Sequence, residues 1–293
     1  MNYLCLDIGG TVIKYGVAEK NGTLLLRGEV PNEIRENDMK CFTDSMESIT
    51  NACRQRFNLQ GIAVSTAGVV DPDSGIVLDH SGFFPPRMAL RELLEQGYGL
   101  PCTVANDANA AALGEYWLGA GRRAKSLYCI TVGSGIGGGA VLNGKLIYGV
   151  SFCAGEIGYL GIGEDVSWEE RASASALISS VAKAKGVSEK KLNGKRIFAM
   201  AKVGDKDAKA AIAKQMDSLA AGIAHICYVL NPERIIIGGG ISAQAEYLYP
   251  LLDAALRKRL IPLVYDNMTL RFAVLKNDAG MIGALYNFLE RHG

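Results

Sequence analysis

The sequence of 293 residues predicts an α/β fold, because short apolar segments alternate along it with longer segments of helical periodicity. Two of the apolar segments also echo one another. Each breaks into glycines and is followed by a second apolar run and an Asn-Gly turn. The copies are offset by 124 residues at Gly9 and Gly133, and by 122 residues at Asn21 and Asn143. This echo suggests a duplicated architecture with two similar halves.

The first half is expected to open with three strands, before helices and strands alternate. The segment after the third strand places Phe42, Met46, Ile49 and Cys53 at helical spacing. Buried strands then run toward glycine or Asn-Asp turns, and each is followed by a helical segment. We expect strands at 2–8, 12–18, 23–30, 61–65 and 101–105, and helices at 36–57, 88–96 and 108–119.

The second half reopens with two strands and becomes predominantly helical. We expect strands at 126–132, 137–148, 234–238 and within 264–274, and helices at 168–184, 207–230, 243–260 and 280–291. Gly119-Ala120-Gly121 is a plausible hinge between the halves, and the last helix can cross back to the first. The expected domains are 1–118 with 280–293, and 119–279.

Composition excludes several classes of protein. The chain has 31 basic and 30 acidic residues, so it lacks the positive charge expected for binding nucleic acid or an anionic membrane. We expect no signal peptide, and no apolar run approaches the roughly 20 residues that span a bilayer. Its seven cysteines form no CxxC pair, which favours reduced thiols. A cytoplasmic protein is expected.

The first glycine loop combines residues suited to a phosphate. Asp7 ends a strand, Gly9, Gly10 and Thr11 follow it, and Lys14 lies on the returning strand. Glycines let backbone N–H groups approach phosphate oxygens, and the Thr11 hydroxyl can add a donor. Asp7 could hold a hydrated Mg²⁺ beside them. An ordinary tight hairpin with a capping aspartate remains open on this motif alone.

Two further glycine clusters follow apolar strands. The loop Gly133-Ser134-Gly135 precedes a strand-like run and not a helix, which argues against a dinucleotide-binding unit. The alternative to a ligand-binding loop is a bulged hairpin, and the similar first loop argues against that alternative. Gly238-Gly239-Gly240 precedes a helix and could lie against a flat adenine. Taken alone, a plain turn between strand and helix is the better interpretation there.

Three carboxylates are candidates for chemistry. Asp107 follows a strand and opens a helix, where it could accept a hydroxyl proton or simply cap the helix. Glu156 lies in a glycine-flanked loop, and Glu169 lies at a helix start, where the helix dipole alone favours an acid. The three histidines have no metal-ligand spacing.

In combination, these residues resemble the ROK family of sugar kinases, within the superfamily of actin, heat-shock proteins and sugar kinases. The resemblance covers nearly the whole chain and rests on several motifs in the right order. They are Asp7-Ile8-Gly9-Gly10-Thr11, 65–71, Asn106-Asp107-Ala108-Asn109-Ala110-Ala111, 131–137, Gly155-Glu156-Ile157-Gly158 and Gly238-Gly239-Gly240.

The resemblance implies a two-lobed, actin-like ATPase (ribonuclease H-like) fold around a central cleft, with MgATP between the glycine loops and a hexose near the hinge. Asp107 would be the catalytic base for the sugar 6-hydroxyl, while Asn106, Glu156, Glu169 and Gly68 would contact the sugar. A homodimer is also implied. The residues that would bind ATP are Asp7 (through hydrated Mg²⁺), Gly9, Gly10, Thr11, Lys14, Thr131, Gly133, Ser134, Gly135, Gly239 and Gly240.

One departure from the family pattern bears on the sugar. Tyr159 stands where the family usually has a histidine, and residues 161–168 lack the cysteines of its zinc motif. We therefore expect no structural zinc, and Tyr159 could donate one hydrogen bond in place of the histidine. Zinc-free members include β-glucoside kinases, so a β-glucoside or glucose is the expected substrate. The alternatives are an N-acetylmannosamine or N-acetylglucosamine kinase, or a non-catalytic sugar-sensing regulator.

Overall fold

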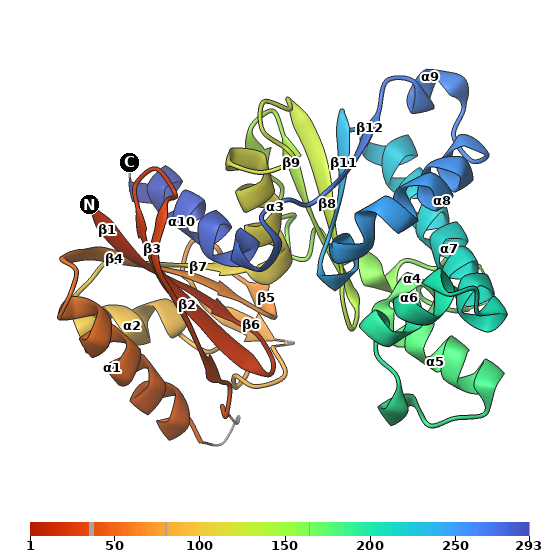
Figure 1. Ribbon diagram of the computed structural model, residues 1–293. Coiled ribbons are helices and arrows are strands. Elements are labelled where there is room, and N and C mark those ends of the chain that lie inside the picture. Colours follow the sequence, from red (N-terminus) through yellow and green to blue (C-terminus); the bar gives the residue numbers. More distant parts are fainter. Residues whose placement is uncertain (35–37, 80, 164, 293) are drawn as a thin grey trace. The chain divides into compact units, whose positions relative to one another are not determined.

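The computed structural model describes residues 1–34, 38–79, 81–163 and 165–292, and the chain forms two compact units (Figure 1). Unit 1 comprises Met1–Arg123, Leu146–Ala154 and Asn277–Gly293, and unit 2 comprises Ala124–Lys145 and Gly155–Lys276. In the described residues, no helix is both long and apolar enough to cross a membrane. No disulfide joins the seven cysteines, and burial raises the pKa of the Cys5 thiol to about 12.

Unit 1 is built on a five-stranded sheet covered by helices on both faces (Figure 1). Alternate residues of its central strand point to opposite faces: Leu4 and Leu6 join the core beneath α1 and α2, whereas Tyr3 and Cys5 pack with α10. The sheet order is β3-β2-β1-β4-β7. The strands are β1 (Asn2–Ile8), β2 (Val12–Glu19), β3 (Leu24–Pro31), β4 (Leu59–Thr66) and β7 (Cys102–Asn106), and the helices are α1 (Lys40–Arg54), α2 (Leu90–Tyr98), α3 (Asp107–Trp117) and α10 (Ala279–His292).

Small residues let α3 and α10 pack at very short distance. A Cβ atom built on Gly283 would lie 1.6 Å from the Ala110 carbonyl oxygen, and one built on Gly114 would lie 2.5 Å from the Ala279 oxygen. These neighbours are backbone atoms, so no side-chain rotation can relieve the overlap. The alanine-rich composition of α3 therefore serves this contact, which attaches the C-terminal helix to unit 1.

Unit 2 repeats the strand order of unit 1. Its sheet runs β10-β9-β8-β11-β12, and β8 pairs antiparallel with β9 and parallel with β11, as β1 does with β2 and β4. The strand lengths also explain why the two echoing segments are 124 residues apart at their glycines but 122 apart at their Asn-Gly turns. β9 is one residue shorter than β2, and Asn143 is the first residue after its strand whereas Asn21 is the second. The strands of this sheet are β8 (Ser126–Val132), β9 (Ile136–Leu142), β10 (Lys145–Leu146, the boundary between the two units), β11 (Arg234–Gly238) and β12 (Thr269–Phe272).

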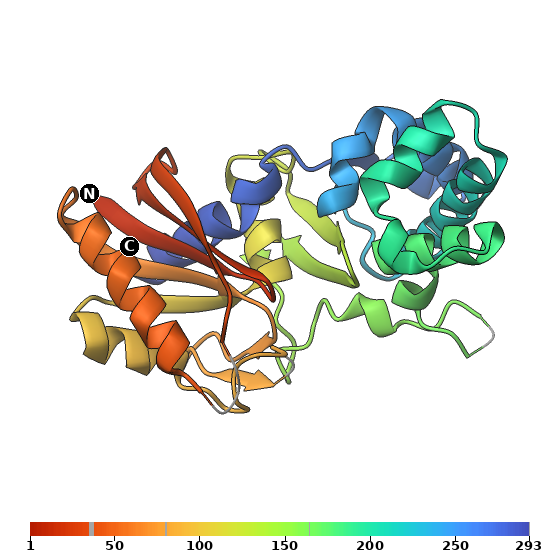
Figure 2. The same ribbon diagram turned by 60° about the horizontal axis from the view of Figure 1, so that its bottom comes forward.

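The helices of unit 2 lie together beside β8 and β9, as the green-to-blue ribbons of Figure 2 show. Their apolar faces share a core with Ile235 and Ile237 of β11, and Trp168 is fully buried in it. The helices are α4 (Trp168–Ala172), α5 (Ala174–Lys185), α6 (Gly194–Lys202), α7 (Lys206–Leu230), α8 (Ala245–Arg257) and α9 (Pro262–Tyr265).

Several expected elements are interrupted or shorter. The helix expected at 168–184 breaks at Ser173, where the backbone is extended. The Ser173 hydroxyl then caps α5 by accepting from the Ala176 N–H. The strand expected at 137–148 turns at Asn143-Gly144, where both residues adopt positive φ. The segment 264–274 contains the end of α9 before β12 begins. Part of the helix expected at 36–57 lies outside the described residues; α1 covers Lys40–Arg54.

A small hairpin and two helices were not predicted from the sequence. The hairpin pairs β5 (Val69–Val70) with β6 (Val77–Asp79), and its strands are too short to show a period. The missed helices are α6 and the four-residue α9. A 3-10 turn, Gly240–Gln244, also precedes α8, so the expected helix at 243–260 begins later and ends earlier.

The contact between α3 and α10 predicts a sensitive glycine. We expect Gly283→Ala to lower the free energy of unfolding by about 2 kcal/mol or more, because overpacking against backbone exceeds the gain in helix propensity. Urea denaturation measures this change. Gly97→Ala in α2 is the matched control, since its Cβ would meet no atom within 4 Å. Equal stability of the two variants would contradict the close helix contact.

Candidate functional site

The first glycine loop lies at the end of β1 and is attached to the end of β3. The Gly9 N–H donates to the Val12 oxygen at 3.0 Å, and Asn32 Nδ2 donates to the Gly9 oxygen at 2.7 Å. The Asn32 N–H also donates to the Thr11 oxygen at 2.9 Å. A Cβ on Gly10 would meet no atom within 4 Å, so the space beside this loop is open within the protein. The loop can therefore be approached closely by a ligand.

Asp7 is held by the two strands that flank β1. Its Oδ1 accepts from Ser65 Oγ at 2.9 Å, and its Oδ2 forms an ion pair with Lys14 Nζ at 3.3 Å. Both partners lie directly opposite Asp7 in the pairing of β1 with β4 and β2. A Cβ on Gly280 would lie 2.7 Å from Asp7 Oδ1, so α10 also approaches the carboxylate. Asp7 thus occupies a defined place beside the loop.

Asn106, and not Asp107, caps α3. Asn106 Oδ1 accepts from the Asn109 N–H at 3.0 Å, while Nδ2 donates to the Gly68 oxygen at 3.0 Å and to Asp107 Oδ1 at 3.2 Å. Asp107 is the first helical residue, its side chain is exposed, and its Oδ1 accepts from the Ala108 N–H at 2.8 Å. The interpretation of Asp107 as the cap of this helix is therefore wrong, because its neighbour supplies the capping oxygen.

The backbone at position 68, whose carbonyl oxygen accepts from Asn106, has a conformation that requires glycine. Its φ is +101°, and a Cβ there would lie 2.7 Å from the Asp79 oxygen. Asn106 lies opposite Thr66 in the pairing of β4 with β7. In unit 1 the structure therefore brings the ends of β1, β4 and β7 to one edge of the parallel part of the sheet, where ligands commonly bind.

The second glycine loop of the sequence lies between β8 and β9 in unit 2. The Gly133 N–H donates to the Gly135 oxygen at 3.0 Å, which closes a tight turn. The Gly133 oxygen accepts from the Ala174 N–H at 2.8 Å, and the Ile136 N–H donates to Glu169 Oε2 at 3.2 Å. A Cβ on Gly133 would meet no atom within 4 Å. The loop is thus held from one side and open beside Gly133.

The third glycine cluster packs directly against the second. Gly239 has φ +74°, and a Cβ there would lie 2.4 Å from the oxygen of Val132, the residue that precedes Gly133. A Cβ on Gly240 would meet no atom within 4 Å. Because β8 and β11 are parallel neighbours, the two loops leave the same edge of the sheet. Unit 2 therefore places two glycine loops side by side.

Glu169 is positioned by a short helix with a buried anchor. Trp168 is 0% exposed, its Nε1–H donates to the Ser218 oxygen at 3.0 Å, and its ring fills the space beside Gly222, where a Cβ would lie 2.1 Å away. Ser167 and Glu170 form a capping box at the helix start. The Ser167 donors lower the pKa of the Glu170 carboxyl. The buried Trp168 and the capping box therefore fix the short helix that carries Glu169.

Glu156 and Tyr159 belong to a loop that packs on β9. Gly155 has φ +113°, and a Cβ there would lie 2.2 Å from the Gly138 oxygen. Glu156 is exposed and precedes a single 3-10 turn, Ile157–Tyr159. Burial raises the pKa of Tyr128, and the charges of Cys129 and Glu156 add to this shift. Glu156 thus lies within electrostatic reach of β8, and Tyr159 is 70% exposed.

Sequence reasoning missed three residues that hold these groups. Asn32 supports the first loop, Ser65 contacts Asp7 from β4, and Gln215 contacts the junction of α4 and α5. None of them stands beside the motif that it supports along the chain. In the described ranges, no group of three or more histidine, cysteine or acidic side chains is arranged to hold a metal ion.

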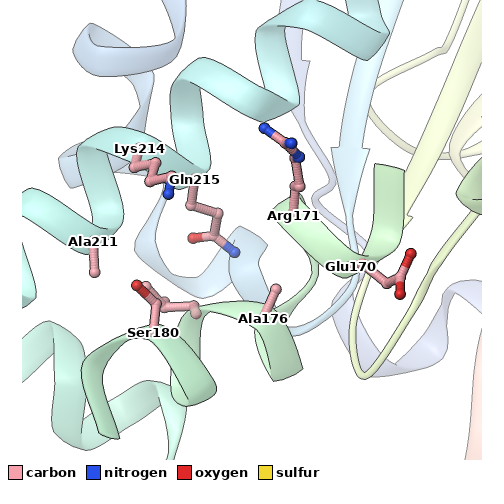
Figure 3. Close-up of a pocket in the computed structure, with 8 residues that line it drawn as sticks. Glu170, Arg171, Ala176, Ser180, Ala211, Lys214 and Gln215 are labelled. Atoms are coloured by element: carbon pink, nitrogen blue, oxygen red, sulfur yellow. The ribbon is translucent and has the colours of Figure 1, made fainter. Parts of the chain in front are cut away.

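A small pocket lies among α4, α5 and α7 of unit 2 (Figure 3). Its volume is about 220 Å³, which is below the roughly 300 Å³ at which ligand pockets usually begin. None of the glycine loops lines it. The residues that line it are Glu170, Arg171, Ala176, Leu177, Ser180, Ala211, Lys214 and Gln215.

Comparison with known proteins identifies the family. The model of the ROK family matches residues 3–291. The chain belongs to the ROK family. This ROK protein is 31% identical over 306 residues to a glucokinase from Halalkalibacterium halodurans, covering 96% of its own chain and 93% of the relative. It is 30% identical over 303 residues to a beta-glucoside kinase from Listeria monocytogenes, covering 99% and 98%.

A solved structure agrees with these relatives. The ROK family glucokinase from Streptomyces griseus, in complex with glucose and AMPPNP, matches with a TM-score of 0.86 and 29% identity over all of both chains. The predicted fold class, the α/β fold of actin-like ATPase sugar kinases, is therefore confirmed for this ROK protein. The expected class of enzyme, a carbohydrate kinase, is confirmed as well.

The capping role of Asn106 predicts a loss of stability. We expect Asn106→Ala to lower the free energy of unfolding by about 1 kcal/mol or more, because the Asn109 N–H loses its acceptor and the Gly68 oxygen loses its donor. Asn106→Asp keeps the capping oxygen and should lose less. Urea denaturation compares the two variants, and an unchanged Asn106→Ala protein would contradict the capping role.

Proposed function

We propose that this enzyme transfers the γ-phosphoryl group of MgATP to the 6-hydroxyl of glucose or of a β-glucoside. The observation that carries the proposal is the placement of Asp107. Its exposed carboxylate stands at the end of β7, oriented by the Ala108 N–H and by Asn106 Nδ2. Since Asn106 caps the helix, capping does not account for the aspartate.

The proposed reaction uses Asp107 as a general base. Asp107 accepts the proton of the sugar 6-hydroxyl while that oxygen bonds to the γ-phosphorus and the bond to the β-phosphate oxygen breaks, which releases ADP. Asn106 keeps the carboxylate in place through its Nδ2 donor. The resemblance also gives Asn106 a contact with a neighbouring sugar hydroxyl. Phosphoryl transfer depends mainly on such positioning and on neutralising charge.

The glycine loops are proposed to bind ATP. Gly10, Gly133 and Gly240 each leave open space where a Cβ would stand, which supports close approach by phosphates or adenine. Thr11, Lys14 and Ser134 would add donors, and Gly9, Thr131, Gly135 and Gly239 shape the loops. The AMPPNP bound by the Streptomyces griseus relative supports this use of ATP.

Asp7 fits a magnesium ion that retains its water shell. It offers hard carboxylate oxygens with an exposed fraction of 18%, and Ser65 and Lys14 orient them. When bound, Mg²⁺ would neutralise phosphate charge. Asp7 would hold its water ligands through hydrogen bonds.

Glu156 and Glu169 are proposed to accept hydrogen bonds from ring hydroxyls, and Tyr159 to donate one. Gly68 would also contact the sugar. The exposure of Tyr159 supports a pocket that is open beside it, which would suit a substituent on the anomeric oxygen. The named glucokinase and beta-glucoside kinase relatives support the same substrates.

Sugar-dependent ADP release tests the proposed substrate. With MgATP, we expect turnover on glucose, cellobiose or an aryl β-glucoside, and much weaker turnover on N-acetylmannosamine and N-acetylglucosamine. A preference for an N-acetylhexosamine would overturn the substrate assignment. No stimulation by any sugar, with ATP still bound, would instead favour a sensing role.

The base assignment predicts the effect of a single substitution. We expect Asp107→Asn to lower kcat by about 10² or more, the scale of a positioned general base, without loss of stability. Steady-state kinetics on the best sugar measures this. Asp207→Asn, at an exposed aspartate in the first turn of α7, is the matched control and should leave kcat unchanged. Equal turnover in both variants would remove Asp107 as the base.

The open space beside Gly10 predicts a selective effect on ATP. Gly10→Ala should leave stability within about 0.5 kcal/mol of the original, because the new Cβ meets no protein atom. It should raise KM for ATP by about tenfold through contact with phosphates. Gly97→Ala serves as control. An unchanged KM for ATP would place the phosphates away from this loop.

A further inference from the structure

The junction of α4 and α5 holds the second glycine loop at both ends. Glu169 Oε2 accepts from the Ile136 N–H at 3.2 Å, and the Ala174 N–H donates to the Gly133 oxygen at 2.8 Å. The Ser173 N–H donates to the Glu169 oxygen at 3.1 Å, which fixes the junction itself. One segment of six residues, 169–174, therefore supports both sides of the loop.

The Glu169 carboxylate fits closely between two backbone segments. A Cβ on Gly135 would lie 2.6 Å from Glu169 Oε2, and a Cβ on Gly158 would lie 3.0 Å from it. Gly135 belongs to the proposed phosphate loop, whereas Gly158 belongs to the loop that carries Glu156 and Tyr159. The same carboxylate thus touches the segment assigned to ATP and the segment assigned to the sugar.

One face of α7 supports this junction. Gln215 is 2% exposed, and its Nε2 donates to the Ala172 oxygen at 2.9 Å and to the Ser173 oxygen at 3.0 Å. Figure 3 shows its side chain extending from α7 toward the helices of the junction. Ser218 and Gly222, which receive Trp168, follow Gln215 by three and seven residues and share its helix face. Gln215 is well placed to determine where Glu169 stands.

We propose that Glu169 couples sugar binding to ATP binding, and that Gln215 is a positioning residue for this coupling. The inference rests on the proposed function, in which Glu169 meets a sugar hydroxyl and the Gly133–Gly135 loop meets phosphates. A sugar hydroxyl that donates to the carboxylate orders it on the Ile136 N–H. ATP then meets a loop that is already ordered, so less conformational entropy is lost when ATP binds.

Calorimetric binding of AMPPNP, with and without saturating glucose, tests this coupling. In the unaltered enzyme we expect glucose to raise AMPPNP affinity by about fivefold or more, the usual lower range for coupled sites. The same must hold in reverse, so AMPPNP must raise glucose affinity by an equal factor. Affinity for AMPPNP that is independent of glucose would overturn the coupling.

The Glu169→Ala variant separates the new role from sugar binding alone. Without sugar present, we expect its AMPPNP affinity to fall by about tenfold, since the Ile136 N–H loses its acceptor. Glu169→Gln keeps an acceptor oxygen and should retain most of the affinity. A residue that only binds sugar would leave AMPPNP affinity unchanged in both variants, and that result would overturn the proposal.

Gln215 is tested in the same assay by Gln215→Met, which removes both donors to the junction. We expect weaker AMPPNP binding and a smaller effect of glucose, with kcat changed less than KM for ATP. Lys214→Gln is the matched control, because Lys214 lines the same pocket beside Gln215 and should leave both affinities unchanged. Equal behaviour of the two variants would remove Gln215 from the positioning role.

Measuring AMPPNP binding without sugar distinguishes a failure of the proposed function from a failure of the proposed coupling. If no sugar were phosphorylated, the proposed function would fail, yet a fall in AMPPNP affinity in Glu169→Ala would still support the hold on the loop. If glucose were phosphorylated while that affinity stayed unchanged, the function would stand and the coupling would be overturned. Thermal unfolding of each variant verifies that it is folded.

Discussion

The amide of Asn106 makes the hydrogen bonds on which the unit 1 site depends. One side chain caps α3, holds the turn at Gly68 and orients Asp107. One side chain can do all three because a neutral amide offers both a donor and an acceptor, whereas an ionised carboxylate can only accept. An aspartate at position 106 could cap the helix but could not hold the Gly68 carbonyl. This division of tasks leaves Asp107 with an exposed carboxylate at the helix start.

In unit 2 the comparable constraint is the burial of Trp168. The indole holds α4 on α7, and α4 places Glu169 against the glycine loop. Residues 161–168 contain no cysteine, and this region is held by an apolar anchor, a capping box and the Gln215 amide. Packing of this kind couples neighbouring groups, because Trp168, Glu169 and the junction cannot shift independently. This packing holds the backbone at Glu169, whereas the proposed coupling acts through the further ordering of its carboxylate by a sugar hydroxyl.

The sequence predicted the elements whose signals are local. Buried strands such as 2–8 and 234–238 show as continuous apolar runs, and the glycine loops show because their residues are adjacent. The echo between the halves predicted a duplicated architecture, and the structure adds that the two sheets share one strand order. The break at Ser173 escaped notice, since a serine within an alanine-rich helical run has no distinctive period.

Other features could not be found locally because they depend on contacts between distant residues. Asn106 and Asp107 are both good capping residues, and the choice between them is made by strand pairing and by the Gly68 carbonyl. Asn32 and Gln215 lie 23 and 42 residues from the backbone atoms at Gly9 and Ser173 that they hold. The short hairpin of β5 and β6 likewise takes its form from tertiary packing. Of the site, the motifs were therefore predictable and their supports were not.

The most direct test of transfer to the 6-hydroxyl compares glucose with 6-deoxyglucose, which lacks only the proposed acceptor oxygen. Phosphorus NMR of the reaction with MgATP would identify the product. We expect a phosphate ester at the 6-position of glucose and no phosphorylation of 6-deoxyglucose, which should instead inhibit the reaction by occupying the sugar site. Transfer to 6-deoxyglucose, or an ester at another position of glucose, would contradict the central claim that Asp107 activates the 6-hydroxyl.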